Sequence, residues 1–202
     1  MAVVQAYQSE TGNGDRIDYV SDAVLARRAV TDPNAFGALY LRYADRIFRH
    51  CYRKLGTREA AEDATSLVFT KALSGIVQFD ANRGTFAAWL FTIANHVLTD
   101  HFRVERRYFS VSDLPERIDP SRTPEEVAVA QEEAGDLRGA LAKLAPRERE
   151  VIELRLAGLS SAEISDVLGC QKNSVAQAQF RAIGRLRMLL GPGAAQQGTH
   201  DV

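Results

Sequence analysis

The segment from Pro146 to Leu190 constrains the fold of this chain more than any other. It reads PREREVIELRLAGLSSAEISDVLGCQKNSVAQAQFRAIGRLRMLL. Two stretches with apolar residues at helical spacing flank a short turn at 169–171, and a third stretch precedes them. This pattern is typical of a helix-turn-helix, whose second helix enters the major groove of DNA. The segment therefore predicts DNA binding, but activators, repressors and promoter-recognition subunits all carry such a unit.

Start and stop signals divide this half of the chain into helices. Gly158 and Gly169 each follow a last helical turn, where a left-handed residue is favoured. Ser160 and Glu163 have the spacing of a capping box, which predicts a helix start between them. The expected helices run from 124 or 125 to 144, from 146 to 157, from 161 to 168 and from 172 to 190.

The N-terminal half predicts a second set of helices. Asp32 and Pro33 are a strong start signal, with the acid at the cap and proline at the first helical position. The expected helices span 22–30 (capped by Ser21), 33–55, 58–74 and 85–107, with a loop over 75–85. The helix over 33–55 has a broad apolar stripe at spacings of three and four, formed by Phe36, Leu39, Tyr40, Tyr43, Ile47, Cys51 and Leu55.

No run alternates apolar and polar residues as a strand would, so the sequence predicts an all-α protein. Prolines, serines and acids over 108–125 indicate a flexible, acidic linker between two small helical domains. The predicted organisation is a disordered tail (1–20), a first domain (21–107), the linker (108–125), a second domain (126–190) and a second disordered tail (191–202).

Charge is unevenly distributed along the chain. The formal net charge is −1, which by itself argues weakly against a nucleic-acid binder. Residues 27–110 carry 13 basic and 8 acidic side chains and residues 140–190 carry 8 and 5, whereas residues 111–139 carry 3 and 8. Two basic blocks separated by an acidic one are the electrostatic pattern expected of a chain with two DNA-binding parts.

The expected helix over 85–107 combines aromatic and basic residues. Its aromatic residues are Phe86, Trp89, Phe91 and Phe102, and its basic residues are His96, His101, Arg103, Arg106 and Arg107. Aromatic rings stack on bases and cations follow phosphates, which is the combination that single-stranded DNA needs. Alternatively the rings form the core. That alternative is favoured for Phe91 and Phe102, and both readings stay open for Trp89.

The last helix has an apolar and a polar side. Its inward stripe is predicted to be Val175, Ala178, Ala182, Leu186 and Leu189. The opposite side presents amides and a hydroxyl that can bond base edges, at Asn173, Ser174 and Gln177. Cations suited to phosphates lie at Lys172, Arg181, Arg185 and Arg187. The alternative is an ordinary solvated helix face.

Other classes of function find little support in the sequence. The four histidines and the two cysteines show no metal-ligand spacing, and there is no glycine-rich phosphate loop, so neither a metal, a cofactor nor a catalytic site is expected. Cys51 and Cys170 are expected to be free thiols. No apolar run is long enough for a membrane span, and the N-terminus does not have the pattern of a secretory signal.

Taken in order, both halves resemble the sigma-70 superfamily, in particular the compact two-domain extracytoplasmic-function (ECF, group 4) sigma factors. FGALYLRYADRIFRHCYRKLG, REAAEDATSLVFTKAL and FDANRGTFAAWLFTIANHVLTDHFRVERR resemble their region 2, and LAPREREVIELRLAGLSSAEISDVLGCQKNSVAQAQFRAIGRLR resembles their region 4. The resemblance covers residues 21–190.

The resemblance implies a cytoplasmic protein that binds core RNA polymerase at the clamp of its largest subunit and directs it to promoter DNA. Family members are commonly held inactive by an anti-sigma factor, so such a partner is expected. The implied minus-ten site comprises Phe79, Asn82, Arg83, Gly84, Thr85, Trp89, Asn95, Arg103, Arg106 and Arg107. The implied minus-thirty-five site comprises Lys172, Asn173, Ser174, Gln177, Arg181 and Arg185. The implied polymerase-binding residues are Asp63, Ser66, Phe69 and Lys71.

Two other functions remain open at this point. A helix-turn-helix regulator with a ligand-sensing or dimerising N-terminal domain would bind duplex DNA alone, usually as a dimer. A helical adaptor that binds only proteins would show no DNA effect when Arg103, Arg106 and Arg107 are replaced. The aromatic and basic segment over 79–107 favours the promoter-recognition subunit, because neither alternative needs it.

Overall fold

The computed structural model describes residues 20–108, 137 and 139–191, with only the backbone course for 104–108. These residues form helices joined by turns, and no strand occurs among them. The elements are α2 (Asp22–Arg28), α3 (Pro33–Leu55), α4 (Arg58–Gly75), the 3-10 turn η2 (Ile76–Gln78), α5 (Phe86–Tyr108), α7 (Pro146–Leu156), α8 (Ser161–Val167) and α9 (Lys172–Leu190). The predicted all-α fold is confirmed.

Residues at the ends of the long N-terminal helices set where these helices begin and end. Asp32 caps α3, because its carboxylate accepts a hydrogen bond from the Asn34 N–H over 3.0 Å. Gly56 ends α3 with φ of +77°, a left-handed conformation that favours glycine. Thr57 then caps α4 by accepting from the Ala60 N–H over 3.4 Å.

The start of α2 differs from the expectation. Ser21 occupies the cap position, but its side chain makes no capping hydrogen bond, and α2 ends at Arg28 rather than at residue 30. The first residue of α2 is instead bound from the side, because the Asp22 carboxylate accepts from Arg42 and from the Tyr43 hydroxyl in α3. Burial, followed by the bond to Asp22, raises the pKa of Tyr43. The predicted local cap is thus not formed, and tertiary contacts hold the first residue of α2 against α3.

The three helices of the helix-turn-helix begin at the predicted residues, and α7 and α8 each end one residue earlier than predicted. Gly158 and Gly169 adopt φ of +84° and +58° at the ends of α7 and α8. The capping box is present, because the Ser160 N–H donates to Glu163 over 2.8 Å and the Glu163 N–H donates to the Ser160 hydroxyl over 3.3 Å. On α9 the inward stripe is shorter than predicted. Leu189 is 42% exposed and does not belong to it.

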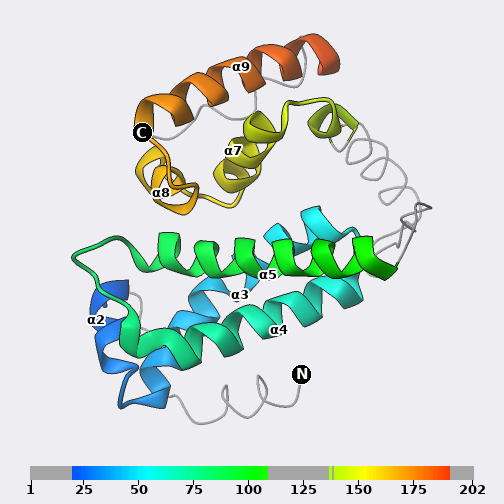
Figure 1. Ribbon diagram of the computed structural model, residues 1–202. Helices are drawn as coiled ribbons and strands as arrows, with labels where there is room; N and C mark the ends of the chain where they lie inside the picture. Colours follow the sequence, from blue (N-terminus) through cyan, green and yellow to red (C-terminus); the bar gives the residue numbers. More distant parts are fainter. Residues whose placement is uncertain (1–19, 109–136, 138, 192–202) are drawn as a thin grey trace, which may run out of the picture.

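Figure 1 shows α5 lying between α4 and the group formed by α7, α8 and α9. The two helical groups share one apolar core rather than standing apart. Residues of α2 to α5 and η2 form most of this core, and the C-terminal group adds Val151, Leu154, Ala157, Leu159, Ile164, Val175 and Ala178. A smaller cluster of Leu141, Leu144, Ile152 and Ala182 closes the far side of the C-terminal group. The sequence did not predict the packing of the two groups.

Several predictions fall on parts of the chain outside the described residues. These are the tails, the linker over 108–125 apart from its first residue, and most of the helix expected before residue 144, of which 137 and 139–142 are helical. In the described part, no helix has the length and apolar content that a membrane span requires. Cys51 and Cys170 are free thiols as predicted.

Candidate nucleic-acid and polymerase interfaces

The loop over 79–85 has a defined shape. Asp80 fixes the turn, because one of its carboxylate oxygens accepts from the Asn82 backbone N–H over 2.9 Å and from the Asn82 side-chain amide over 3.0 Å. Thr85 caps α5 by accepting from the Ala88 N–H over 3.2 Å. Asn82 and Arg83 are both exposed. The loop thus presents an amide and a guanidinium to solvent on a fixed backbone.

An aromatic cluster supports this loop. Phe79, Phe86 and Trp89 have ring centroids 5.5 to 5.6 Å apart. Phe86 is buried, whereas Phe79 and Trp89 are only partly buried. The Trp89 ring also lies against Gly75, where a side-chain Cβ would be 3.5 Å from it. Trp89 therefore packs on the core and keeps one part accessible, which leaves both of its predicted roles possible. Phe91 is fully buried and belongs to the core, as predicted.

A cavity of about 310 Å³ lies between α2 and this loop. The loop contributes Phe79, Asp80 and Asn82 to its lining, α2 contributes Arg27, and the turn after α2 contributes Val30. An aromatic ring, a carboxylate, an amide and a guanidinium around one cavity can stack on a base and bond its edge.

Farther along α5, the predicted minus-ten residues Asn95 and Arg103 differ in their exposure and in their partners. Asn95 is half-buried, and its side-chain oxygen lies 3.3 Å from Nε2 of His50 in α3. Arg103 is exposed and pairs with Asp100 over 3.1 Å. The side chains of Arg106 and Arg107 lie outside the described residues. Asn95 is thus engaged inside the protein, whereas Arg103 is available to a ligand.

His50 of α3 is a buried titratable group beside this helix. Burial lowers its pKa from 6.5 to about 4, although the bond to Asn95 acts in the opposite direction. The imidazole is 1% exposed, and its Nδ1 has no hydrogen-bond partner within the described part of the chain. His50 is therefore neutral near pH 7, and its protonation opposes folding.

This shift predicts a pH dependence of stability. Between pH 6.5 and 4 the unfolded chain binds a proton that the folded chain does not, so the free energy of unfolding falls as the pH falls. Between pH 7 and pH 5 this group should account for a loss of about 2 kcal/mol, and His50→Gln should remove most of that loss. Urea unfolding at both pH values measures it. His96→Gln, at an exposed histidine of α5, is the control; equal pH dependence of His50→Gln and the wild type would contradict the prediction.

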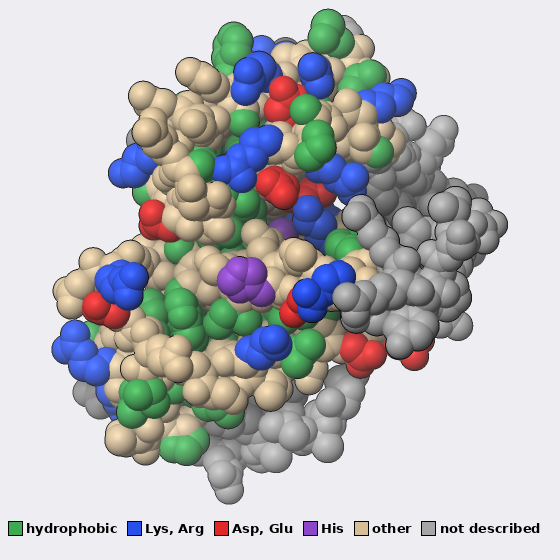
Figure 2. All heavy atoms as spheres, viewed as in Figure 1, with side chains coloured by type: hydrophobic (Ala, Val, Ile, Leu, Met, Phe, Trp, Pro, Cys, Tyr) green, Lys and Arg blue, Asp and Glu red, His purple; other side chains and the backbone are tan. Residues whose placement is uncertain are grey.

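The outward side of α9 carries the predicted minus-thirty-five residues. Lys172, Asn173, Ser174 and Gln177 are all exposed. Arg181 and Arg185 are also exposed, but both lie beside the buried carboxylate of Glu148 in α7, at 3.6 Å and 3.2 Å. Figure 2 shows Lys and Arg side chains spread over the part of this face that α7 and α9 form. The helix thus combines free amides at its start with arginines whose position is set by α7.

Phe180 was missed in the sequence analysis. Its side chain is 81% exposed, which is unusual for a large aromatic residue. It follows Gln177 by three positions, so both lie on the same side of α9. The helical spacing alone could have indicated this, because Phe180 falls outside the inward stripe.

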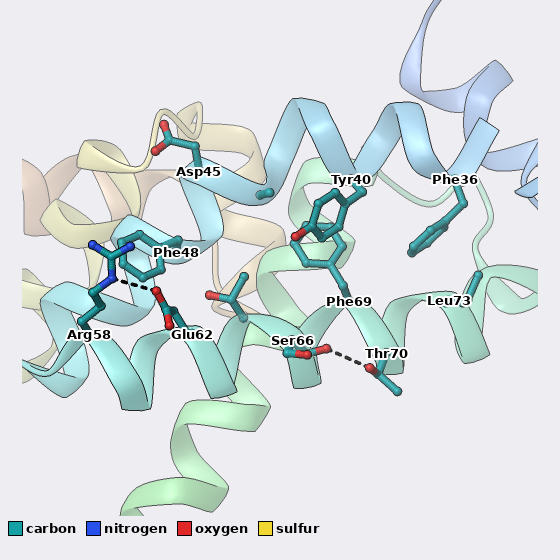
Figure 3. Close-up of a pocket in the computed structure, with 12 residues that line it drawn as sticks. Phe36, Tyr40, Asp45, Phe48, Arg58, Glu62, Ser66, Phe69, Thr70 and Leu73 are labelled. Carbon is teal, nitrogen blue, oxygen red and sulfur yellow. Dashed lines mark hydrogen bonds and ion pairs between the residues drawn. The ribbon is translucent and has the colours of Figure 1, made fainter. Parts of the chain in front are cut away.

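A groove of about 650 Å³ runs between α3 and α4. Figure 3 shows aromatic side chains of α3 directed toward Phe69 and Leu73 of α4. The ring centroids of Tyr40 and Phe69 are 4.7 Å apart. An ion pair between Arg58 and Glu62, with a distance of 2.8 Å, lies at one end of the groove. Leu73 is 51% exposed. The groove is therefore apolar along its floor and charged at its edge, as a site for a helical partner would be.

The predicted polymerase-binding residues do not share one surface. Ser66 and Phe69 line the groove between α3 and α4. Asp63 lines a second groove between α4 and α5, together with Leu67 and Val97. Lys71 is exposed. The described residues contain no group of acids, histidines and cysteines that could hold a metal ion.

The family model "Sigma-70 region 2" matches residues 39–108, and the model "Sigma-70, region 4" matches residues 134–186. The ECF RNA polymerase sigma factor BldN of Streptomyces coelicolor is 34% identical over 170 residues, which cover 83% of this chain and 64% of that relative. The ECF RNA polymerase sigma factor ShbA of Streptomyces griseus is 30% identical, over 84% of this chain and 95% of that relative. The solved structure of CnrH in complex with the cytosolic domain of CnrY has a TM-score of 0.65 and 27% identity, covering 84% of this chain and 96% of that chain. Both regions are thus matched in order and nearly the full length of one relative is covered, so the chain belongs to the ECF sigma factors of the sigma-70 family.

Proposed function

We propose that this protein binds core RNA polymerase, directs it to promoters and starts transcription there, and that it acts in the cytoplasm. The observation that supports the proposal is that one chain presents two different surfaces whose chemistry suits DNA. The loop over 79–85 with its aromatic cluster suits unpaired bases, and the start of α9 suits the edges of paired bases. A regulator that binds only duplex DNA does not need the first surface.

The groove between α3 and α4 is the docking surface that we assign to core polymerase. Its aromatic floor offers apolar area to a helix of the polymerase clamp, and Ser66 and Phe69 belong to it. Arg58 and Glu62 at its edge can pair with charges on either side of such a helix. Asp63 and Lys71 lie outside the groove lining, so we give them a smaller part in docking.

For the minus-ten element we assign the cavity between α2 and the loop as the place for an unstacked base. Phe79 and Asn82 line it, and Arg83 stands next to it on the exposed loop. Arg103 is placed to follow the phosphates along α5. Asn95 bonds with His50 inside the protein. If Asn95 binds DNA through its side-chain oxygen, this bond to His50 must first break.

For the minus-thirty-five element, Gln177→Ala should reduce discrimination at one base position by about tenfold, because a bidentate amide contact supplies roughly 1–3 kcal/mol. The measurement is transcription from a set of promoters in which each position of that element is changed in turn to each of the other three bases. Gln179→Ala is the matched control, because Gln179 is on the same helix but bonds with Arg155 of α7 over 2.9 Å. If transcription by Gln177→Ala depends on every base position of the element as in the wild type, Gln177 does not belong to the site.

The test of the whole proposal is reconstituted run-off transcription. Purified protein is mixed with core polymerase and a library of genomic fragments, and specific transcripts should appear only when both are present. Tight duplex binding by a dimer without polymerase would favour the regulator instead. We also propose an anti-sigma partner, since the similar CnrH was solved in complex with the cytosolic domain of CnrY. Affinity capture with the full chain would detect it.

A further inference from the structure

A separate cavity of about 360 Å³ lies between α3 and α5 on one side and α7 and α8 on the other (Figure 1). It shares no lining residue with the loop cavity or with the two grooves described above. Contacts between helices hold its walls in place, such as the hydrogen bond of 3.0 Å that Arg46 of α3 donates to the Ala157 carbonyl after α7. Sites for small molecules have volumes of about 300–1,000 Å³, so the cavity is large enough for one small ligand.

One part of the cavity wall is basic. Lys54 of α3 and Arg147 of α7 line the cavity, and His96 of α5 adds an exposed imidazole. The Arg147 guanidinium is held at the wall, because it donates to the Leu168 carbonyl at the end of α8 over 3.3 Å. Arg147 also pairs with Glu150 over 3.4 Å, but these side chains are 42% and 46% exposed. Such a surface ion pair is weak, so an anionic ligand can compete for the guanidinium.

The charges behind this wall do not cancel. Lys54 pairs with Glu153 of α7, whose side chain is 2% exposed. Arg149 bonds to the same carboxylate over 2.8 Å, and Arg53 donates to the Glu153 carbonyl over 3.4 Å. With the exposed ion pair of the wall included, four cations stand against two carboxylates, an excess of two positive charges. Such an excess attracts a dianion, and a phosphate monoester carries a charge of about −1.5 to −2 at pH 7.

The rest of the wall is apolar and includes an aromatic ring. Phe102 of α5 lines the cavity together with Leu154 of α7 and Val167 of α8. Leu154 is 1% exposed, and Phe102 and Val167 are partly buried. A flat ring can pack against Phe102, and the apolar side chains remove part of its surface from water. The cavity thus suits a ligand with an anionic group at one end and a flat ring at the other.

We propose that this cavity binds a small phosphate monoester that carries a flat ring, a chemical class to which adenosine 5′-monophosphate (AMP) belongs. Arg147 and Lys54 bind the phosphate, and His96 bonds with one of its oxygens. The ring of the ligand packs on Phe102. A carboxylate would neutralise only one of the two excess charges, which favours the phosphate. The inference does not depend on the proposed function, because binding requires neither polymerase nor DNA.

The test is equilibrium dialysis of radiolabelled AMP against the full chain. Unlabelled adenosine, inorganic phosphate and phenyl phosphate serve as competitors on the wild type, so this part needs no variant to fold. Arg147→Ala removes the guanidinium from the wall. Arg49→Ala is the matched control, because Arg49 also pairs with an acid of its own helix, Asp45, but does not line the cavity. Arg27→Ala reports on binding of AMP in the loop cavity instead.

We expect one saturable AMP site in the wild type and in Arg49→Ala, and an affinity weaker by about tenfold or more in Arg147→Ala. Phenyl phosphate should compete with AMP, whereas adenosine and inorganic phosphate, which each lack half of the ligand, should compete less well by about tenfold or more. The proposal is overturned if AMP shows no saturable binding in the millimolar range, or if inorganic phosphate competes as well as phenyl phosphate. Equal weakening in Arg147→Ala and Arg49→Ala would also overturn it, as would a loss in Arg27→Ala rather than in Arg147→Ala.

Discussion

Replacing Leu73 with aspartate is expected to weaken binding to core RNA polymerase by about 30-fold or more. Leu73 is 51% exposed at the edge of the groove between α3 and α4, so the free protein tolerates a charge there. In the complex the same charge would be buried against an apolar partner without a counter-ion. Titration of labelled protein with core polymerase measures the dissociation constant directly.

Val24→Asp provides the control for this loss. Val24 is 46% exposed on α2 and does not line the groove, so the same substitution is made at similar exposure on another helix. It should leave the dissociation constant within about twofold. If both variants bind equally well, or both equally poorly, the groove is not the docking surface and the polymerase binds elsewhere.

The second large effect is expected at the loop. Combining Asn82→Ala and Arg83→Ala should reduce transcription from duplex promoters about 100-fold, because a lost base contact and a lost phosphate contact each cost about 1–3 kcal/mol. Both side chains are exposed, and the loop keeps its aromatic support, so the fold should be unaffected. These positions test the loop more cleanly than Trp89, whose replacement would also disturb the core.

A template with an artificial bubble at the minus-ten element separates melting from binding. If the loop acts in melting, the bubble should restore most of the activity of the double variant, and binding to core polymerase should equal that of the wild type. A bubble template that gives no recovery would show that the loop has no specific part in strand separation.

Most of the secondary structure could be predicted, because the signals are local. Asp32, Gly56 and Thr57 act within one turn of their own helix ends, and all three do what their residue types suggest. Ser21 is the exception, because its side chain makes no capping bond, while Arg42 and Tyr43 bind the neighbouring Asp22. A competing tertiary partner cannot be seen in a local pattern.

The arrangement of the two helical groups could not be predicted for the same reason. Arg46 and Ala157 are 111 positions apart, and nothing at either position indicates the other. The groove between α3 and α4 could not be predicted either, because both helices line it and their relative position is not a local property of the sequence. Residue types indicated which side chains were candidates for binding, but not that Asn95 bonds with His50 or that Glu148 holds Arg181 and Arg185.

The ion pairs of Glu148 bear on how α9 finds its target. A buried carboxylate partly neutralises two arginines, so under the proposed function α9 should attract DNA of any sequence less strongly than its composition suggests. Recognition of the minus-thirty-five element should then depend more on uncharged side chains, and Asn173, Gln177 and Phe180 are exposed for such contacts. Under the proposed function, such a helix should bind non-specific DNA weakly, and binding of the same chain to polymerase would raise its local concentration at the promoter.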